Sequence, residues 1–340
     1  GYPMKIKQTD ADRALAKKYI ERQSKMEVSR SNWENHWQEC MDYIVPRKND
    51  VTSTSAPGER RGDELFDTTA ILSNQLLSAA LHSMLTNPAS RFFDLTMDEK
   101  ELDNSDDVKE YLQECGNLIF KALSSSNFQT EIHEIYIDLG SIGTACMYMG
   151  EDENKVVHFG ARPMKEIYIE ENNLGLIDTV HRVFEWKLRQ IVQEFGEVNL
   201  APELIKKYRD GNDDLHKIIH CVSPTTDDDK KEYGSTHAYK SVYVLLESAS
   251  ILSNGKGFHE FPYAVPRWTK TSGEIYGRGP GMDMLADIKM VNAMMKTTLQ
   301  GAQMTVSPAW SVADDSVIGR VRISPNGITL VRPGSDPIRP

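Results

Sequence analysis

One segment near the C-terminal end of the chain restricts the possible fold more than any other. Residues 283–303 show a helical pattern in which apolar positions repeat at spacings of four, three, four and three, namely Met284, Ile288, Val291, Met295 and Thr298. A stripe with this heptad-like spacing needs a neighbouring helix to cover it. The glycine-rich segment 273–281 precedes it, and Pro280 suits a first helical turn. The pattern therefore predicts a long helix that packs along Met284, Ile288, Val291 and Met295.

A second face of the same predicted helix is polar. Lys289, Asn292, Lys296 and Gln300 lie together on it, and we expect this face to stay in water. Two interpretations remain open at this point. The segment is either a core helix with a solvated back, or one of a ring of such helices whose polar faces line a lumen. Periodicity alone does not separate these two interpretations.

The rest of the chain divides into helices followed by strands. Hydrophobic periodicity predicts helices over 11–45, 67–87, 105–123, 128–139 and 187–195. Strand patterns cover 92–95, 144–149, 156–158, 166–170, 179–184, 216–222 and 241–247. Pro46 is expected to end the first helix, and residues 308–340 look extended and rich in turns. The fold class is therefore α+β, with helices first, then a meander of strands, then one long helix and an extended arm.

Charge and cysteine content exclude several classes of protein. Among the 340 residues, 39 are Lys or Arg and 50 are Asp or Glu, so the net charge is −11. A chain this acidic is unsuited to gripping nucleic acid over its whole surface, although local contact stays possible. The four cysteines are widely spaced and form no C-x-x-C pair, which argues against a zinc ribbon. No apolar stretch is long enough for a membrane span. We expect a soluble chain without a metal or another cofactor.

One group of residues suggests an enzyme as the alternative function. Asp178 followed by Glu185 and Lys187 resembles the arrangement with which many nucleases hold Mg²⁺, where carboxylates bind the ion and the lysine orients a water. On a strand, Glu185 and Lys187 point to the same side. The pattern is loose, because any hairpin with a solvated face produces it. The sequence contains neither a Walker A loop nor a G-x-S-x-G nucleophile motif.

An ordered series of short motifs runs along the chain. The series comprises Trp33, Trp37 and Tyr43-Ile44-Val45-Pro46; Gly62 and Phe66-Asp67-Thr68-Thr69-Ala70; Leu85, Asn87-Pro88 and Arg91-Phe92-Phe93; Ser126-Asn127-Phe128; Asp138-Leu139 and Gly143-Thr144-Ala145; Val183-Phe184 and Arg189-Gln190; and Arg267-Trp268 with Tyr276-Gly277-Arg278-Gly279-Pro280. Together they resemble the portal, or head-to-tail connector, proteins of short-tailed bacteriophages. No single motif is specific, and the resemblance rests on their order over residues 11–340.

The resemblance implies a structural role without an active site. Portal subunits form a ring, usually of about twelve copies, at one vertex of the capsid, and the resemblance places this chain in the virion after assembly in the host cytoplasm. Double-stranded DNA passes through the ring, without sequence specificity, during packaging and ejection. The ring docks the packaging motor (terminase), the capsid and the tail or adaptor proteins. No membrane is involved.

The resemblance also implies a division of the chain. Residues 1–275 would form the wing, 276–303 the first stem helix, and 304–340 an incomplete clip. Lys289, Asn292, Lys296 and Gln300 would line the channel, whereas the apolar stripe would pack the stem. The clip carries a basic patch made of Arg320, Arg322, Arg332 and Arg339. Family members continue into a second stem helix, a channel loop and a crown, so we expect that C-terminal part to be absent from a chain that stops at Pro340.

Overall fold

The computed structural model describes residues 10–48, 50–53, 62, 64–98, 105–197, 200–212, 214–227, 236–308, 310–313 and 324–331. Its α-helices are α1 (Asp10–Ile44), α2 (Thr69–Leu85), α4 (Asp106–Ser125), α5 (Phe128–Ile142), α6 (Leu188–Phe195), α7 (Pro202–Arg209), α9 (Pro280–Asp283) and α10 (Leu285–Val306). Its strands are β1 (Cys146–Asp152), β2 (Val156–Arg162), β3 (Ile167–Glu171), β4 (Ile177–Lys187), β5 (Leu215–Pro224), β6 (Tyr239–Leu245), β7 (Ser250–Phe258), β8 (Tyr263–Ala264), β9 (Trp310–Ala313) and β10 (Ile328–Val331). The predicted α+β class is confirmed.

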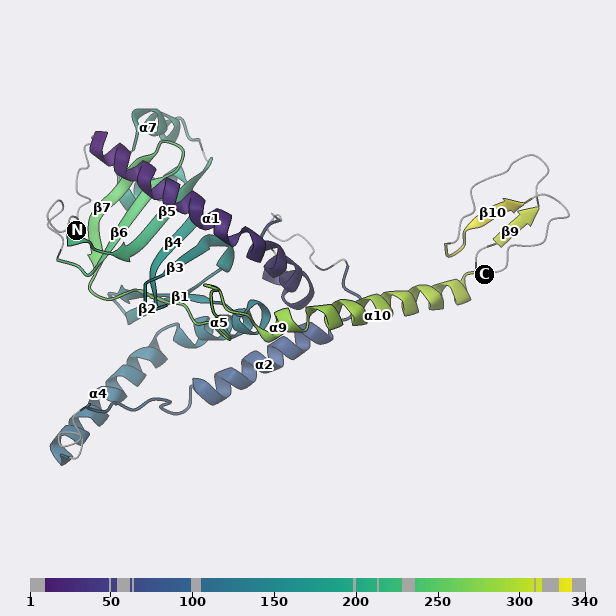
Figure 1. The fold of residues 1–340 in the computed structure, drawn as a ribbon, viewed down its shortest axis with the longest axis horizontal. Coiled ribbons are helices and arrows are strands. Elements are labelled where there is room, and N and C mark those ends of the chain that lie inside the picture. Colours follow the sequence, from purple (N-terminus) through teal and green to yellow (C-terminus); the bar gives the residue numbers. More distant parts are fainter. Residues whose placement is uncertain are drawn as a thin grey trace.

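The centre of the fold is a five-stranded antiparallel meander in the order β3-β4-β5-β6-β7. Helix α1 crosses one face of this sheet (Figure 1) and packs Ala16 and Tyr19 against Ile219, Cys221 and Val242. The other face is covered at one end by α6 and α7, which bury Leu188, Ile191 and Leu204. Both faces of the sheet are therefore buried, as expected of a core element.

Arg30 ties α1 to the edge of this sheet. Its guanidinium is 1% exposed and donates hydrogen bonds to the carbonyl oxygens of Met164 (2.8 Å), Ile167 (2.5 Å) and Lys165 (3.1 Å). It also pairs with Glu34 and lies 3.6 Å from the centroid of the Tyr168 ring. A buried charge is tolerated when it is paired and hydrogen-bonded, and Arg30 meets both conditions.

A second, smaller sheet in the order β2-β1-β8 lies beside α5. Helices α2 and α5 pack together, and the Asn74 side chain of α2 donates a hydrogen bond to the carbonyl of Ile137 in α5. The C-terminal half of α1 joins this region through Trp37, Met41 and Ile44, which are buried as their spacing predicts. The main core therefore unites α1, α5 and the edges of both sheets.

Helix α10 leaves this body and carries the short parallel pair β9–β10 near its far end (Figure 1). At 1.5 Å per residue its 22 residues extend about 33 Å. No helix among the described residues is both long enough and apolar enough to cross a bilayer. The cysteines Cys40, Cys115, Cys146 and Cys221 are all free thiols.

One sequence-based expectation about secondary structure is wrong, and two elements were not expected. Residues 92–95 form no strand, because Phe92 is used to stack on Phe128 at a centroid distance of 6.1 Å. Helix α7 and strand β7 were not predicted. The α7 segment is short and highly charged, and β7 contains Asn254, Gly255 and Gly257, residue types that are depleted in strands. Tertiary contacts determine the secondary structure of these segments and override their local preference.

Candidate assembly surface at helix α10

Two glycine-rich segments meet where α10 begins, and we call them the glycine joint (residues 140–144 and 277–281). A Cβ atom on Gly143 would lie 2.2 Å from the backbone nitrogen of Gly279, and one on Gly279 would lie 2.6 Å from the carbonyl oxygen of Leu139. Gly143 also has φ +74°, a conformation that favours glycine. The two backbones therefore touch directly, with no side chain between them.

Hydrogen bonds lock the glycine joint. The hydroxyl oxygen of Thr144 accepts a bond from the Gly277 amide (2.8 Å), and the Gly143 carbonyl accepts one from the Trp268 amide (2.9 Å). Pro280 stands in the first turn of α9, as its position in the sequence predicts. The glycine-rich turn thus has a structural role.

Aromatic side chains surround the glycine joint. Tyr276 is buried, with ring centroids 5.0 Å from Trp37 and 5.8 Å from Trp33, and its hydroxyl accepts a hydrogen bond from the Ile169 amide (3.4 Å). Burial raises the pKa of Tyr276 to about 12, so it stays a neutral hydrogen-bonding phenol. Arg278 lies over the Trp33 ring and pairs with Glu274, and its hydrogen bond lowers the pKa of that carboxyl.

Asn292 corrects the expectation of a solvated polar face on α10. Its side chain is 7% exposed, and its Oδ1 accepts hydrogen bonds from the amides of Phe66 (2.7 Å) and Asp67 (3.1 Å). Its Nδ2 donates to the carbonyl of Glu64 (3.1 Å). The side-chain amide of Asn292 makes hydrogen bonds that hold residues 64–67 against the helix. Asn292 therefore does not face water in this chain.

The two lysines of that face lie against aromatic rings of the same chain. Lys289 Nζ pairs with Glu39 at 2.7 Å and lies 5.9 Å from the centroid of the Tyr43 ring. Lys296 Nζ lies 5.4 Å from the centroid of the Phe66 ring. Gln300, one turn further, is exposed. The structure therefore attaches the first half of the polar face to α1 and residues 64–67, and leaves the second half in water.

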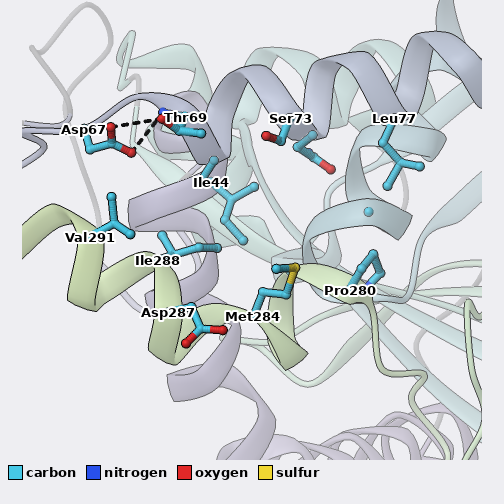
Figure 2. A pocket seen from close by; sticks show the side chains of 14 residues that line it. Ile44, Asp67, Thr69, Ser73, Leu77, Pro280, Met284, Asp287, Ile288 and Val291 are labelled. Atoms are coloured by element: carbon cyan, nitrogen blue, oxygen red, sulfur yellow. Dashed lines mark hydrogen bonds between the residues drawn. The ribbon is translucent and has the colours of Figure 1, made fainter.

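The apolar stripe of α10 borders a cavity of about 290 Å³ (Figure 2). Met284, Ile288 and Val291 line one side, and α2 residues such as Ala70, Ser73 and Leu77 line the other. The helix that packs against this stripe is α1, whose Ile44 shares a core cluster with Ile288, and α2 lies across the cavity. The cover is incomplete, because Met284 is 56% exposed, Val291 41% and Met295 39%. We call this cavity the α2–α10 groove.

The nuclease alternative fails on geometry. Asp178, Glu185 and Lys187 all belong to the single strand β4, so Asp178 and Glu185 lie about 23 Å apart along it. Glu185 is close to Lys217 (3.9 Å) rather than to another carboxylate. Within the described residues no group of three or more His, Cys, Asp or Glu side chains is placed to hold a metal ion. The three residues do not converge on one site.

Arg320, Arg322, Arg332 and Arg339, the predicted basic patch, lie outside the described residues. Sequence reasoning also missed the outer surface of α2, where Leu72, Leu76, Met84 and Leu85 are 55–80% exposed. A signal was present, because α2 contains no charged residue at all, which is unusual for a surface helix.

Comparison with known proteins gives a consistent answer. A family model described as "Bacteriophage head to tail connecting protein" matches residues 16–340. The "Probable portal protein" of Bordetella phage BPP-1 is 27% identical over 327 residues, which cover 94% of this chain and 59% of that protein. The "Portal protein" of Salmonella phage epsilon15 is 27% identical over 324 residues, covering 93% and 58% respectively. The chain therefore spans a little under three fifths of the length of these two relatives.

Proposed function

Because the chain belongs to the bacteriophage head-to-tail connecting family, we propose that it is a structural subunit of the phage portal, in which it forms a ring at one capsid vertex. The observation that carries this proposal is the match over residues 16–340, together with 27% identity to two phage portal proteins. The role of such a subunit is structural, not enzymatic.

The architecture supports a division into wing, stem helix and clip. Helix α10 leaves the body at the glycine joint, and the β9–β10 pair follows it (Figure 1). We assign residues 1–275 to the wing, 276–303 to the first stem helix and 304–340 to the clip. The glycine joint contains parts of two motifs that carry the resemblance, Gly143-Thr144 and Gly277-Arg278-Gly279-Pro280. Their direct contact supports a common role in fixing where the stem begins.

The proposed function in DNA passage is passive. A ring of acidic subunits holds a DNA backbone weakly, because tight binding requires Lys and Arg to neutralise phosphates. Lys289, Lys296 and Gln300 are the proposed residues for transient contacts in the channel. The ion pair of Lys289 with Glu39 reduces the positive charge that Lys289 presents to DNA, which favours sliding of the DNA over its retention.

We assign three kinds of protein partner to the ring in the virion: the capsid, the tail or adaptor proteins, and the packaging motor (terminase) during assembly. The arginines of residues 316–340 would bring positive charge to the clip, where motor or tail docks.

Images of single particles of the protein test the assembly. The expected result is rings of about twelve copies with a central hole. Dispersed monomers across a wide range of protein concentration would contradict the proposal.

A second experiment tests the channel residues. Lys289→Glu combined with Lys296→Glu should slow DNA packaging in the assembled phage, because two repulsive charges per subunit then line the channel. The matched control is Lys109→Glu with Lys121→Glu on α4, far from α10 in the chain. Unchanged packaging by the α10 variant would show that these two lysines do not line the channel.

A further inference from the structure

Helix α10 carries two apolar faces on opposite sides. The first, the groove-side stripe, consists of Met284, Ile288, Val291, Met295, Leu299 and Val306. The second, the outer stripe, consists of Ala286, Met290, Ala293, Met294, Thr297 and Gly301. At 100° per residue the centres of the two stripes lie about 160° apart around the helix axis. A helix that only covered its own body would need one such stripe.

The outer stripe has no cover within the described part of the chain. Met290 is 51% exposed and Met294 is 60% exposed, and a Cβ atom on Gly301 would meet nothing within 4 Å. The stripe contains no charged residue, and over 290–306 the whole helix has a single charge, Lys296. Packing another surface onto this stripe would therefore desolvate no ion.

The α2–α10 groove offers a surface of matching chemistry. Ile288 and Val291 line it from α10 and Ala70 and Leu77 from α2. Among the described residues that line it, only Asp67 and Asp287 are charged (Figure 2). The carboxylate of Asp67 already accepts hydrogen bonds from the amide (3.1 Å) and hydroxyl (3.0 Å) of Thr69. The groove is thus largely apolar, and the Asp67 carboxylate at its edge already has hydrogen-bond donors. At about 290 Å³ it is large enough to admit side chains from another molecule.

The amount of exposed apolar surface also indicates a missing partner. The exposed large side chains on α2 and α10 are Leu72, Leu76, Met84, Leu85, Met284, Met290, Val291, Met294, Met295, Leu299 and Val306, with exposures of 39–84%. Summed over both helices and more than one face, they expose on the order of 1,000 Å² of apolar surface. About 800 Å² on each partner is enough for a specific interface.

We propose that the outer stripe of one copy docks into the α2–α10 groove of a second copy, with Met290 and Met294 entering the groove. The two surfaces lie on different sides of the same helix, so each copy offers one of each. Such a contact is heterologous, and repeated around an axis it closes a ring. Methionine suits this position because its flexible thioether adapts to a neighbour's shape. The inference rests on the proposed ring, and it adds which two surfaces form the contact.

Cross-linking between separately prepared chains tests this pairing directly. In a Cys115→Ser background, the remaining native thiols are buried. One chain carries Met290→Cys and the other carries Ser73→Cys. Mild oxidation of the mixture should yield a covalent mixed dimer, whereas either chain alone should yield at least tenfold less. Absence of the mixed dimer would overturn the proposed pairing.

A charge variant separates this inference from the proposed function. Met290→Asp with Met294→Asp should weaken self-association at least tenfold, measured by sedimentation and particle images. The matched control is Val28→Asp, because Val28 is an apolar residue of α1 that is 76% exposed. Circular dichroism and thermal unfolding confirm that each variant folds. Normal rings formed by the double variant would refute the pairing and leave the portal function standing. Absence of any assembly by the unaltered protein would refute both.

Discussion

The body of the molecule and the α2–α10 region use their side chains in opposite ways. In the body, even a buried charge such as Arg30 has all its partners within the chain, and His181 and His220 are enclosed as neutral rings. Along α2 and α10, large apolar side chains stay exposed. The comparison teaches that the core of the body is packed largely within the single chain, whereas the α2–α10 region gathers exposed apolar side chains suited to contact with another surface. Four predictions test this difference.

The largest effect is expected at the glycine joint, where the two regions meet. Gly143→Ala should destabilise the protein by more than about 3 kcal/mol, because its Cβ would overlap the Gly279 backbone at a positive φ. Chemical denaturation measures the change. Gly301→Ala is the matched control in the exposed part of α10, and it should stabilise the protein by about 0.5–1 kcal/mol. Equal changes in unfolding free energy for the two substitutions would show that the glycine joint is no more tightly packed than the exposed part of α10.

Arg30 tests whether the body depends on its internal polar contacts. Arg30→Met should cost about 3 kcal/mol of unfolding free energy, because three buried carbonyl oxygens lose their donor. Arg209→Met is the control, since the exposed Arg209–Glu197 pair should contribute less than about 0.5 kcal/mol. A loss below 1 kcal/mol for Arg30→Met would show that the body tolerates an incomplete interior.

The buried histidines predict how the body responds to acid. Burial lowers the pKa of both His181 and His220 from the ordinary 6.5 to about 3. Between these values the unfolded chain binds protons that the folded chain does not, so stability falls as the pH falls below 6.5. Each histidine should contribute a loss of about 1 kcal/mol per pH unit. Denaturation curves from pH 7 to pH 4.5 measure the slope.

Substitution separates the histidine contribution from that of other groups. His181→Gln keeps a polar side chain beside Gln23 but cannot take up a proton, so it should remove about half of this slope. His158→Gln, at an exposed position of strand β2, is the control and should leave the slope unchanged. An unaltered slope in His181→Gln would show that His181 does not cause the acid sensitivity.

The smallest effect is expected where α10 is attached to its own chain. Asn292→Ala should cost about 1–2 kcal/mol, because the amides of Phe66 and Asp67 lose their acceptor. Faster hydrogen exchange at these two amides would show the local release. Gln300→Ala, on the exposed half of the same face, should change neither quantity. Unchanged exchange in Asn292→Ala would mean that other contacts hold residues 64–67 in place.

Much of the fold could be predicted from the sequence because its helices have strong periodicity. The face formed by Trp37, Met41 and Ile44 is buried as their spacing indicates, and Gly196 ends α6 with φ +77°. The long helix was expected over 283–303 and is found at Leu285–Val306. Strands β1 to β6 were each located, although their ends differ by a few residues.

The candidate site was predicted only in part, because periodicity does not say what covers a face. Asn292 belongs to the polar side of α10 by its angle, yet residues 64–67, more than 200 residues earlier, come to lie on it. Nothing local to Asn292 indicates that contact. The outer stripe could not be predicted for a related reason: the heptad-like spacing indicates one packed face, and Met290 and Met294 lie on the opposite side of the helix.

The glycine joint has a mechanical consequence. Where main chain rests on main chain, the direction of α10 is set by rigid peptide planes and not by side chains that can change rotamer. Because α10 is about 33 Å long, a small change of its direction at the glycine joint becomes a large displacement at its far end. A tilt of 10° would move that end by about 6 Å. A joint formed by backbone atoms alone keeps such a tilt small. Helix α10 should therefore have the same orientation relative to the body in every copy of the subunit.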